Sequence, residues 1–400
     1  MTTNLEREVY LDHHSTTPVD DRVFEEMKPY FTEKYSNPAS KDNHALGQEA
    51  NRAMEAARKQ VADAIGAETG GEVTAKSIIF TSGATESDNL ALQGLARTAD
   101  EKGIGKHIVT SEIEHDAILE TCKILEERGF EVTYVAVDEY GRVDPADIDA
   151  AIQDDTFIVS VMAANNEIGT INPIEEIGDV VSQYDETWFH SDAVQAIGYL
   201  DVNVNEMNID LMSISGHKIY GPNGIGALYA NFEVKNKLQP ILFGGGHESN
   251  KRSGTPNVPA IVGLGEAMKL ADKNRQKRVD HVEELRDLLW ERISSEIDDV
   301  ILNGHPEHRL PNNLNVSFPS VNAKELVRMS LSNKGIMAAL GSACSSDNDS
   351  SHVMKSIADD PDRINNAVRF GLGKDVTEPD IEYAADVIIE EVSLTSSIFG

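Results

Sequence analysis

Lys218 lies in a segment rich in glycine and hydroxyl groups, where a lysine could act as a nucleophile. Lys218 closes the sequence Ser-Ile-Ser-Gly-His-Lys and is followed by Ile-Tyr-Gly-Pro. An amine attacks a carbonyl carbon in its neutral form, and burial lowers the pKa of a lysine towards that form. Ser215 and His217 could donate hydrogen bonds to a phosphate beside it. Most lysines in glycine-rich loops lie on the surface, so this interpretation depends on the motifs that follow.

A phosphate could be bound by a second motif, Ser-Gly-Ala-Thr-Glu at residues 82–86. The motif lies between an expected strand and an expected helix, and backbone N–H groups at the start of a helix bind phosphate well. Ala84 and Thr85 lie at this start, where Thr85 adds a hydroxyl group. An ordinary capped helix is the alternative, and for the motif in isolation it is the commoner one.

Three further polar residues suit a cofactor with a pyridine ring. Asp192 lies in the sequence His-Ser-Asp-Ala-Val-Gln, where its carboxylate could keep a ring nitrogen protonated. Gln195, one helical turn later, could reach a hydroxyl group on the ring. His115 could stack on the ring and transfer protons near neutral pH. The alternatives are a helix N-cap for Asp192 and a structural role for His115. Together the motifs point to pyridoxal 5′-phosphate (PLP), which Lys218 would hold as a Schiff base.

The two cysteines differ in their surroundings. Cys344 lies in the small, polar sequence Leu-Gly-Ser-Ala-Cys-Ser-Ser-Asp-Asn-Asp-Ser-Ser, which is typical of an exposed loop. A thiol on such a loop could act as a nucleophile, and an incidental surface thiol is the alternative. Cys122 lies in a partly apolar helical segment and is expected to be buried. Two cysteines without metal-ligand or disulfide spacing predict no metal site and favour a reducing cytoplasm.

The composition is strongly acidic. Among 400 residues, Asp and Glu total 68 and Lys and Arg total 35, which gives a net charge of -33. This balance argues against direct binding of nucleic acid, because phosphate contacts require clustered Lys and Arg. The first ten residues carry charges and no apolar core of a signal peptide. No apolar run approaches the roughly 18 residues of a membrane span.

From residue 77 onward, short apolar strands alternate with helical patterns. This alternation predicts a mostly parallel sheet that is covered by helices on both faces. The candidate residues follow these strands, and the carboxyl ends of parallel strands meet at one edge of a sheet, so their loops should converge on one crevice. The expected strands are residues 77–81, 107–110, 132–137, 157–162, 188–190 and 210–213, with helices near residues 90–95, 118–125 and 148.

A second, smaller domain is expected after two prolines at residues 256 and 259. Residues 262–297 have the pattern of one long amphipathic helix. We predict a large PLP-binding domain at residues 18–265, and a small α+β domain formed by residues 1–17 and 266–400 that carries the Cys344 loop. The long helix should bury one stripe of apolar residues, namely Val282, Leu285, Leu289 and Ile293.

Taken in order along nearly the whole chain, these motifs resemble those of the cysteine desulfurases of the NifS/IscS kind. These enzymes form part of the class V aminotransferase-like branch of the fold-type I PLP enzymes. The resemblance implies an α/β fold, with a mostly parallel seven-stranded sheet in the large domain. The motifs that carry it are Tyr-Leu-Asp-His-His-Ser-Thr-Thr-Pro at 10–18, Asn-Pro-Ala-Ser at 37–40, Ser-Gly-Ala-Thr-Glu at 82–86, Asn-Asn-Glu-Ile-Gly at 165–169, Ser-Gly-His-Lys at 215–218, Arg-Ser-Gly-Thr-Pro at 252–256, Gly-Ser-Ala-Cys at 341–344 and Val-Arg-Phe-Gly-Leu-Gly at 368–373.

The resemblance implies an enzyme that removes sulfur from L-cysteine, forms a persulfide on Cys344, releases L-alanine and passes the sulfur to an acceptor protein. Lys218 would bind PLP and move the Cα proton, and Arg369 would hold the substrate carboxylate with its planar fork of donors. Thr255 would reach the phosphate site of the other subunit of a homodimer. The other roles implied are Asp192 at the ring nitrogen, His115 on the ring, Asn166 and Gln195 at the ring hydroxyl, Asn166 also at the substrate, and Ala84, Thr85, Ser215 and His217 at the phosphate.

Other functions are compatible with parts of this pattern. A selenocysteine lyase or another class V PLP enzyme would share the cofactor residues, and a transaminase would not need Cys344. A protein of another class, an inactive scaffold of a sulfur-transfer complex, would not need the whole set of residues. The acceptor could be an iron–sulfur scaffold, a tRNA-thiolation protein or part of a DNA phosphorothioation system. The chain departs from the family pattern at Asp347 and Asp349 and at Lys374, where arginine is usual.

Overall fold

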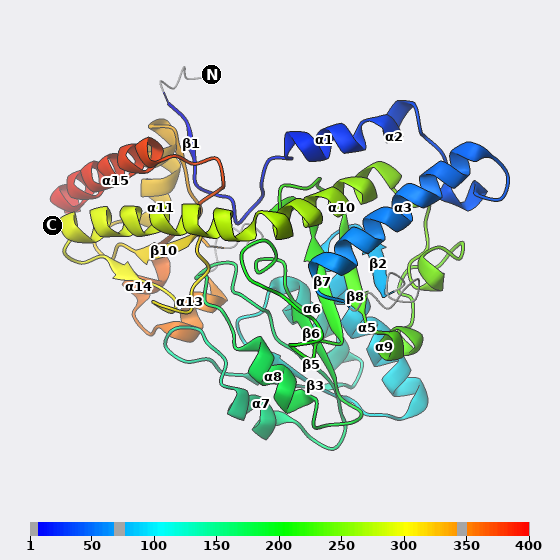
Figure 1. Ribbon diagram of the computed structural model, residues 1–400. Helices are drawn as coiled ribbons and strands as arrows, with labels where there is room; N and C mark the ends of the chain where they lie inside the picture. The colour runs from blue at the N-terminus through cyan, green and yellow to red at the C-terminus, as the bar shows by residue number, and fades with distance from the viewer. Residues whose placement is uncertain (1–6, 68–76, 342–349, 400) are drawn as a thin grey trace.

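The computed structural model describes residues 7–67, 77–341 and 350–399, with side chains up to residue 395. Within these ranges, seven strands form one central sheet (Figure 1). They are β2 (Ile78–Thr81), β3 (His107–Ser111), β4 (Glu131–Val135), β5 (Thr156–Ser160), β6 (Trp188–Asp192), β7 (Leu211–Ser215) and β8 (Gly226–Ala230).

The strand order is β2-β8-β7-β6-β5-β3-β4. Neighbouring strands are parallel except at β8, which runs antiparallel to both β2 and β7. The prediction of a mostly parallel seven-stranded sheet is therefore confirmed. The strand β8 is not among those that the sequence pattern predicts.

Helices cover both faces of this sheet. Successive side chains of a strand point to opposite faces, so Ile79 packs into one layer and Phe80 into the other. Because both faces are buried, the strands appear in the sequence as continuous apolar runs. One layer contains α5 (Ala84–Lys102), α6 (Asp116–Glu127) and α9 (Phe232–Lys237), and the other contains α3 (Ala45–Ala64), α7 (Pro145–Ala151), α8 (Ile174–Val181) and α10 (Val258–Lys273).

The segment before α3 lies along the edge of this second layer. Helix α1 (Asp21–Met27) packs against α10, and α2 (Pro29–Thr32) and the 3-10 turn η1 (Pro38–Ser40) lead from it into α3 (Figure 1). Asp20 caps α1 by accepting a hydrogen bond from the Arg22 backbone N–H.

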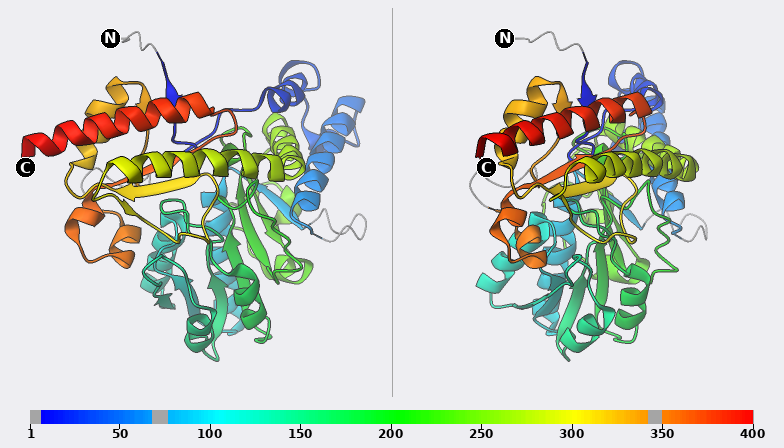
Figure 2. Two further views of the ribbon diagram at one scale, coloured as in Figure 1. Left: turned by 60° about the vertical axis from the view of Figure 1, so that its left-hand side comes forward. Right: turned by 90° about the vertical axis from the view of Figure 1, so that its left-hand side faces the viewer.

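A second core lies beside the large sheet. Two long helices, α11 (Arg275–Glu296) and α15 (Glu378–Phe399), run side by side over a small antiparallel sheet (Figure 2). Its strands lie in the order β12 (Ala367–Gly371), β10 (Asn313–Ser317) and β9 (Ile301–Leu302). The amino-terminal strand β1 (Val9–Tyr10) pairs in parallel with β11 (Ile336–Met337) in the same core. The remaining elements of this region are short helices: α12 (Ala323–Glu325), the π-helical η4 (Leu326–Leu331), α13 (His352–Ile357) and α14 (Pro361–Asn365). Two 3-10 turns lie in loops of the large-sheet region, η2 (Gly216–Lys218) and η3 (Glu248–Asn250).

The prediction of a single helix over residues 262–297 is wrong, because α10 and α11 meet at Asn274. The backbone of Asn274 leaves helical geometry, and its side-chain amide donates to the carbonyl of Leu270 at 2.8 Å. Such side-chain hydrogen bonds compete with the helical ones and end α10. The apolar stripe on α11 is nevertheless buried as expected. Along these two helices, Ala271 still packs in the core of the large sheet, whereas Val282 packs in the second core. The domain boundary at residue 265 stays a prediction.

Among the helices of the described ranges, none is both long and apolar enough to span a bilayer.

Candidate active site

A cavity of about 560 Å³ lies where the carboxyl ends of β6 and β7 meet the start of α5. The second core closes it from the other side, through β12 and the amino-terminal segment that follows β1. The loops that follow the strands therefore meet at one cavity, as the sequence predicts. Ten of the predicted site residues line this cavity: Ala84, Thr85, His115, Asn166, Asp192, Gln195, Ser215, His217, Lys218 and Arg369.

Lys218 enters the cavity from η2, which directly follows β7. Its Nζ donates to the backbone carbonyls of His14 at 2.5 Å and Ser15 at 2.8 Å. The turn before it is tight, since a Cβ atom at Gly216 would lie 2.9 Å from the carbonyl oxygen of Pro222. The amine is thus held by a segment that lies 204 residues away in the sequence.

Asp192 and His115 face the same cavity from β6 and from the start of α6. The carboxylate of Asp192 accepts from the backbone N–H of Val194 at 2.9 Å, and the residue lines the cavity. Residues 193–200 form turns and not a helix, so the helix N-cap alternative is not found. Burial raises the pKa of Asp192, while the nearby His115 and Lys218 oppose that rise. His115 accepts from the Ala117 N–H through Nδ1 at 3.1 Å. A neutral His115 ring therefore carries its proton on Nε2.

The start of α5 leaves backbone donors available at one end of the cavity. Gly83 is the N-cap, and among the described residues no side chain caps this helix. The N–H of Ser82 is taken by Glu86 at 2.7 Å, whereas Thr85 in the first turn faces the cavity. Burial lowers the pKa of His217 to about 4, so its ring is neutral at pH 7 and can donate one hydrogen bond. These groups match the needs of a bound phosphate.

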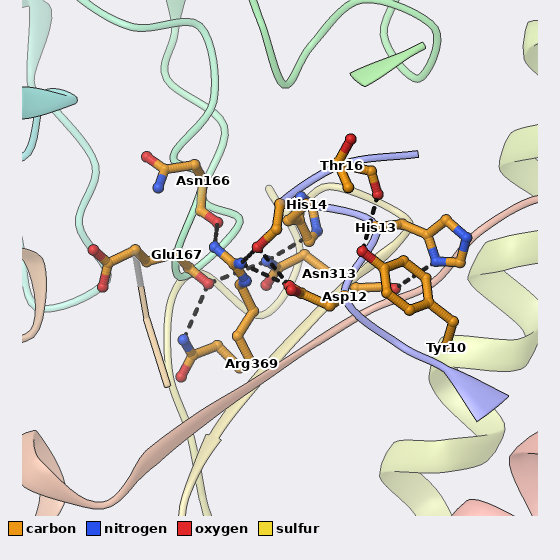
Figure 3. Close-up of polar contacts among 12 residues, drawn as sticks. Tyr10, Asp12, His13, His14, Thr16, Asn166, Glu167, Asn313 and Arg369 are labelled. Carbon is orange, nitrogen blue, oxygen red and sulfur yellow. Dashed lines mark hydrogen bonds and ion pairs between the residues drawn. The ribbon is translucent and has the colours of Figure 1, made fainter. Parts of the chain in front are cut away.

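Arg369 also lines the cavity, and its guanidinium lies close to Asp12 and Asn166 (Figure 3). It comes from β12 and is only 1% exposed. Its Nη1 donates to the Asn166 carbonyl at 2.8 Å, and its Nη2 donates to Asp12 at 3.0 Å and to the Ser15 hydroxyl at 2.8 Å. Its Nε has no hydrogen-bond partner among the described residues. The guanidinium is thus already oriented, and its Nε–H group is not used.

Two buried acids lie near Asp192. Both side-chain oxygens of Asp88, which is fully buried, lack a hydrogen-bond partner within the described ranges. Burial and the nearby Asp192 hold the pKa of Asp88 well above its usual value. The ring of His190 lies 3.7 Å from Asp88, and burial lowers the pKa of His190 to about 3. Burial also raises the pKa of Glu114 to about 8. Two acids whose pKa values are raised by burial therefore lie near Asp192.

One predicted residue that the structure describes, Thr255, does not line this cavity. Thr255 lines a neighbouring cavity of about 230 Å³, which shares Ser82 and Gly224 with the first. Cys344 lies outside the described residues, as do Asp347 and Asp349.

Several polar residues of the cavity wall were not predicted as site residues, among them His14, Ser15, Thr16 and Asp88. The first three form a polar run directly after the apolar sequence of β1, which is a visible signal. Asp88 lies on the same face of α5 as Leu92 and Leu95, both of which are fully buried. A charged residue on an apolar helix face is uncommon, and this departure could have identified Asp88.

The set of groups in the cavity fits PLP. An amine, a buried carboxylate and a cluster of phosphate donors occupy separate parts of its wall, at Lys218, at Asp192 and at the start of α5. These are the groups that position this cofactor and tune its electronic properties.

Known proteins resemble this chain along nearly its whole length. Residues 9–384 match the family model described as aminotransferase class-V. A protein named "Cysteine desulfurase IscS" from Dictyoglomus turgidum is 45% identical over 96% of this chain and 94% of its own length. A solved structure named "NIFS-LIKE PROTEIN" has a TM-score of 0.89 and 39% identity, and covers 97% of this chain and 100% of its own. Another, described as SspA in complex with cysteine, has a TM-score of 0.79 and 36% identity, with 91% and 98% covered.

The match to the family model, the identity to curated cysteine desulfurases and the shared fold agree with one another. This chain therefore belongs to the aminotransferase class-V family and, within it, to the cysteine desulfurases.

Proposed function

We propose that this enzyme uses PLP, held on Lys218, to remove sulfur from L-cysteine and release L-alanine. The observation that carries the proposal is the meeting of Lys218, Asp192 and Arg369 in one cavity. Asp192 ends β6, Lys218 follows β7 in η2, and Arg369 belongs to β12 in the second core. A reactive amine, a partner for a ring nitrogen and a clamp for a carboxylate are the parts that this reaction requires.

When bound, PLP would withdraw electrons from the substrate's Cα and so make its proton acidic. Asp192 would keep the ring nitrogen protonated, and the charges of the nearby His115 and Lys218 favour the carboxylate form that this role requires, against the effect of burial. His115 would stack on the ring. The Lys218 amine would remove the Cα proton. The remaining contacts would come from Asn166 and Gln195 at the ring hydroxyl and from Ala84, Thr85, Ser215 and His217 at the phosphate.

Arg369 would orient the substrate by its carboxylate. Its guanidinium is held by Asp12, Ser15 and the Asn166 carbonyl, so little rotational freedom remains to be lost when substrate binds. Asn166 would contact the substrate as well. The Cys344 thiolate would attack the substrate sulfur, so that a new S–S bond forms while the C–S bond breaks. The products are a persulfide on Cys344 and L-alanine, and the persulfide sulfur would pass to an acceptor protein.

We also propose a homodimer in the reducing cytoplasm. Thr255 lies beside the main cavity, in a neighbouring cavity that shares part of its wall, which suits a residue that reaches a partner's phosphate site. Closed two-fold pairs are the commonest oligomers. Cys344 must be a free thiol to attack, and the cytoplasm keeps thiols reduced.

The test is to follow label from L-[³⁵S]cysteine in the wild type, in Cys344→Ser and in the matched control Cys122→Ala. The Cys344→Ser variant should still bind PLP, and added cysteine should still change the visible absorbance of the bound cofactor. The variant should retain no labelled sulfur and form no alanine. Cys122→Ala should behave like the wild type, because burial raises the pKa of Cys122 to about 12 and leaves it unreactive. Undiminished alanine formation by Cys344→Ser would overturn the proposed role of Cys344.

A further inference from the structure

A chain of buried hydrogen bonds runs from Arg309 to the cavity, and its donors and acceptors can be assigned one by one. Arg309 is buried, and burial lowers its pKa to about 9, so it is protonated at neutral pH and only donates. Its Nη1 lies 3.2 Å from Oδ1 of Asn313. That oxygen must therefore accept, which fixes the Asn313 amide group with its nitrogen on the other side.

The Asn313 nitrogen then has two protons to donate. One goes to the carbonyl of Glu167 at 3.1 Å, and the other meets Nε2 of His14 at 3.2 Å (Figure 3). Nε2 of His14 therefore accepts. A neutral imidazole has one donor and one acceptor, so the proton of His14 is on Nδ1.

The same logic orients Gln195. Nδ1 of His14 lies 2.8 Å from Oε1 of Gln195, so His14 donates and Gln195 accepts. The Gln195 amide nitrogen donates one proton to the backbone carbonyl of His14 at 3.2 Å. Its second proton has no partner among the described residues, and Gln195 lines the cavity. The amide therefore presents an N–H group, and not its oxygen, to whatever the cavity binds.

We propose that His14 is a positioning residue that locks the Gln195 amide with one N–H directed into the cavity, towards the ring hydroxyl of the cofactor. The inference rests on the proposed function for the identity of the ligand. His14 touches Gln195 through both its side chain and its backbone, so it leaves the amide no alternative orientation. Without the His14 side chain, only the backbone carbonyl of residue 14 would hold the amide. The amide could then turn over for part of the time and present its oxygen, which would repel an anionic ring oxygen.

The lock is insensitive to pH in the working range. His14 is 1% exposed, and burial, followed by the charge of Arg369, lowers its pKa to about 3. The ring thus stays neutral and keeps one donor and one acceptor. A protonated ring would donate from both nitrogens and break the contact with Asn313.

Three variants separate the two side-chain hydrogen bonds of His14, to Gln195 and to Asn313. His14→Phe fills the space of the ring and removes both of them. His14→Asn places an amide nitrogen at the position of Nδ1 and keeps a donor for Gln195. His14→Gln places its terminal atoms at the position of Nε2 and keeps only the contact with Asn313. The matched control is His13→Phe, because His13 is also buried in the same segment and binds Gly371 instead.

The experiment measures PLP affinity after removal of the cofactor, the pH midpoint of the visible band of the reloaded enzyme, and the thermal unfolding of the cofactor-free protein. A donated hydrogen bond stabilises an anionic oxygen and lowers its pKa. His14→Phe should therefore raise the pH midpoint of the band and weaken PLP binding by roughly tenfold. His14→Asn should restore the midpoint and His14→Gln should not. His13→Phe should lower thermal stability without moving the band.

Two results would overturn the inference while leaving the proposed function intact. One is a band in His14→Phe that titrates as in the wild type. The other is a midpoint that His14→Gln restores as well as His14→Asn does. Absence of any PLP band in the wild type would instead overturn the proposed function, and the inference with it.

Discussion

The Nη2 atom of Arg369 and the Oδ1 atom of Asp12 lie 3.0 Å apart. The guanidinium that should bind a substrate carboxylate is thus already paired with a carboxylate of the protein. Ser15 contacts both partners, donating to Asp12 at 2.7 Å and accepting from Arg369 at 2.8 Å. Asp12 therefore orients Arg369 and at the same time reduces the positive charge that the substrate meets.

Replacing Asp12 by asparagine should lower the KM for L-cysteine by a few fold. The amide oxygen can still accept from Arg369, so the orientation is kept, while the competing negative charge is lost. Arg369→Lys should raise KM at least tenfold, because lysine lacks the planar fork of donors. Steady-state alanine formation measures both. Asp20→Asn is the control, since Asp20 pairs with Arg22 and Lys374 and does not line the cavity. A higher KM in Asp12→Asn would contradict the competition.

Lys218→Ala should yield a protein without a borohydride-reducible bond to PLP. The amine of Lys218 is the group in the cavity that can bond covalently to an aldehyde. Reduction followed by peptide mapping measures this directly. Lys251→Ala is the matched control, because the amine of Lys251 also donates to a backbone carbonyl, that of Leu238 at 2.6 Å, but lies outside the cavity. A reducible bond that persists in Lys218→Ala would refute the assignment.

Glu114→Gln should flatten the loss of stability between about pH 5 and pH 8. Burial raises the folded-state pKa of Glu114 from 4.5 to about 8. Over that interval the unfolded chain has lost the proton that the folded chain keeps, so the free energy of unfolding falls as pH rises, by up to about 1.4 kcal/mol per pH unit. Glutamine cannot ionise, and its oxygen can still accept from Ser111 and from the Met162 N–H. Urea unfolding at four pH values compares the two proteins, and parallel curves would contradict this expectation.

Ser351→Ala should destabilise the protein by about 1 kcal/mol or more. Its hydroxyl caps α13 by accepting from the Met354 N–H at 3.1 Å, and it donates to Glu167 at 2.6 Å. Ser350→Ala is the control, because the Ser350 hydroxyl makes a single exposed hydrogen bond, to Asn365. Denaturant midpoints measure both variants. An equal, small effect of the two substitutions would show that the Ser351 contacts add nothing.

The chemistry of the large domain could be predicted from the sequence because each reactive residue follows a recognisable strand. Asp192 ends β6, and Lys218 comes directly after β7. The period and length of the apolar runs thus place these side chains at one edge of the sheet. The break at Asn274 was missed because neither glycine nor proline marks it, although residues 272–278 are all polar and interrupt the apolar pattern. The local hydrogen bond of the Asn274 side chain ends the helix.

The contacts of His14 could not be predicted in the same way. Asn313, which sets its tautomer, lies 299 residues further along the chain. Its other partner, Gln195, lies 181 residues away. No local period or spacing encodes such pairings, because they depend on how the two cores meet. The role of His14 could therefore be recognised only once both cores were in place.

The parallel pairing of β1 with β11 has a consequence for the order of events during synthesis. Residues 9–17 leave the ribosome before the segments that hold them, since Val9 pairs with Ile336 and Asp12 with Arg369. The large sheet can form while this leading segment is still without its partners, because domains generally fold as units as they emerge. The backbone carbonyls that accept hydrogen bonds from the Lys218 amine belong to this same segment. A ribosome stalled before residue 336 would thus carry a folded sheet with an incomplete cavity, and competence to take up cofactor would be among the last properties that the nascent chain acquires.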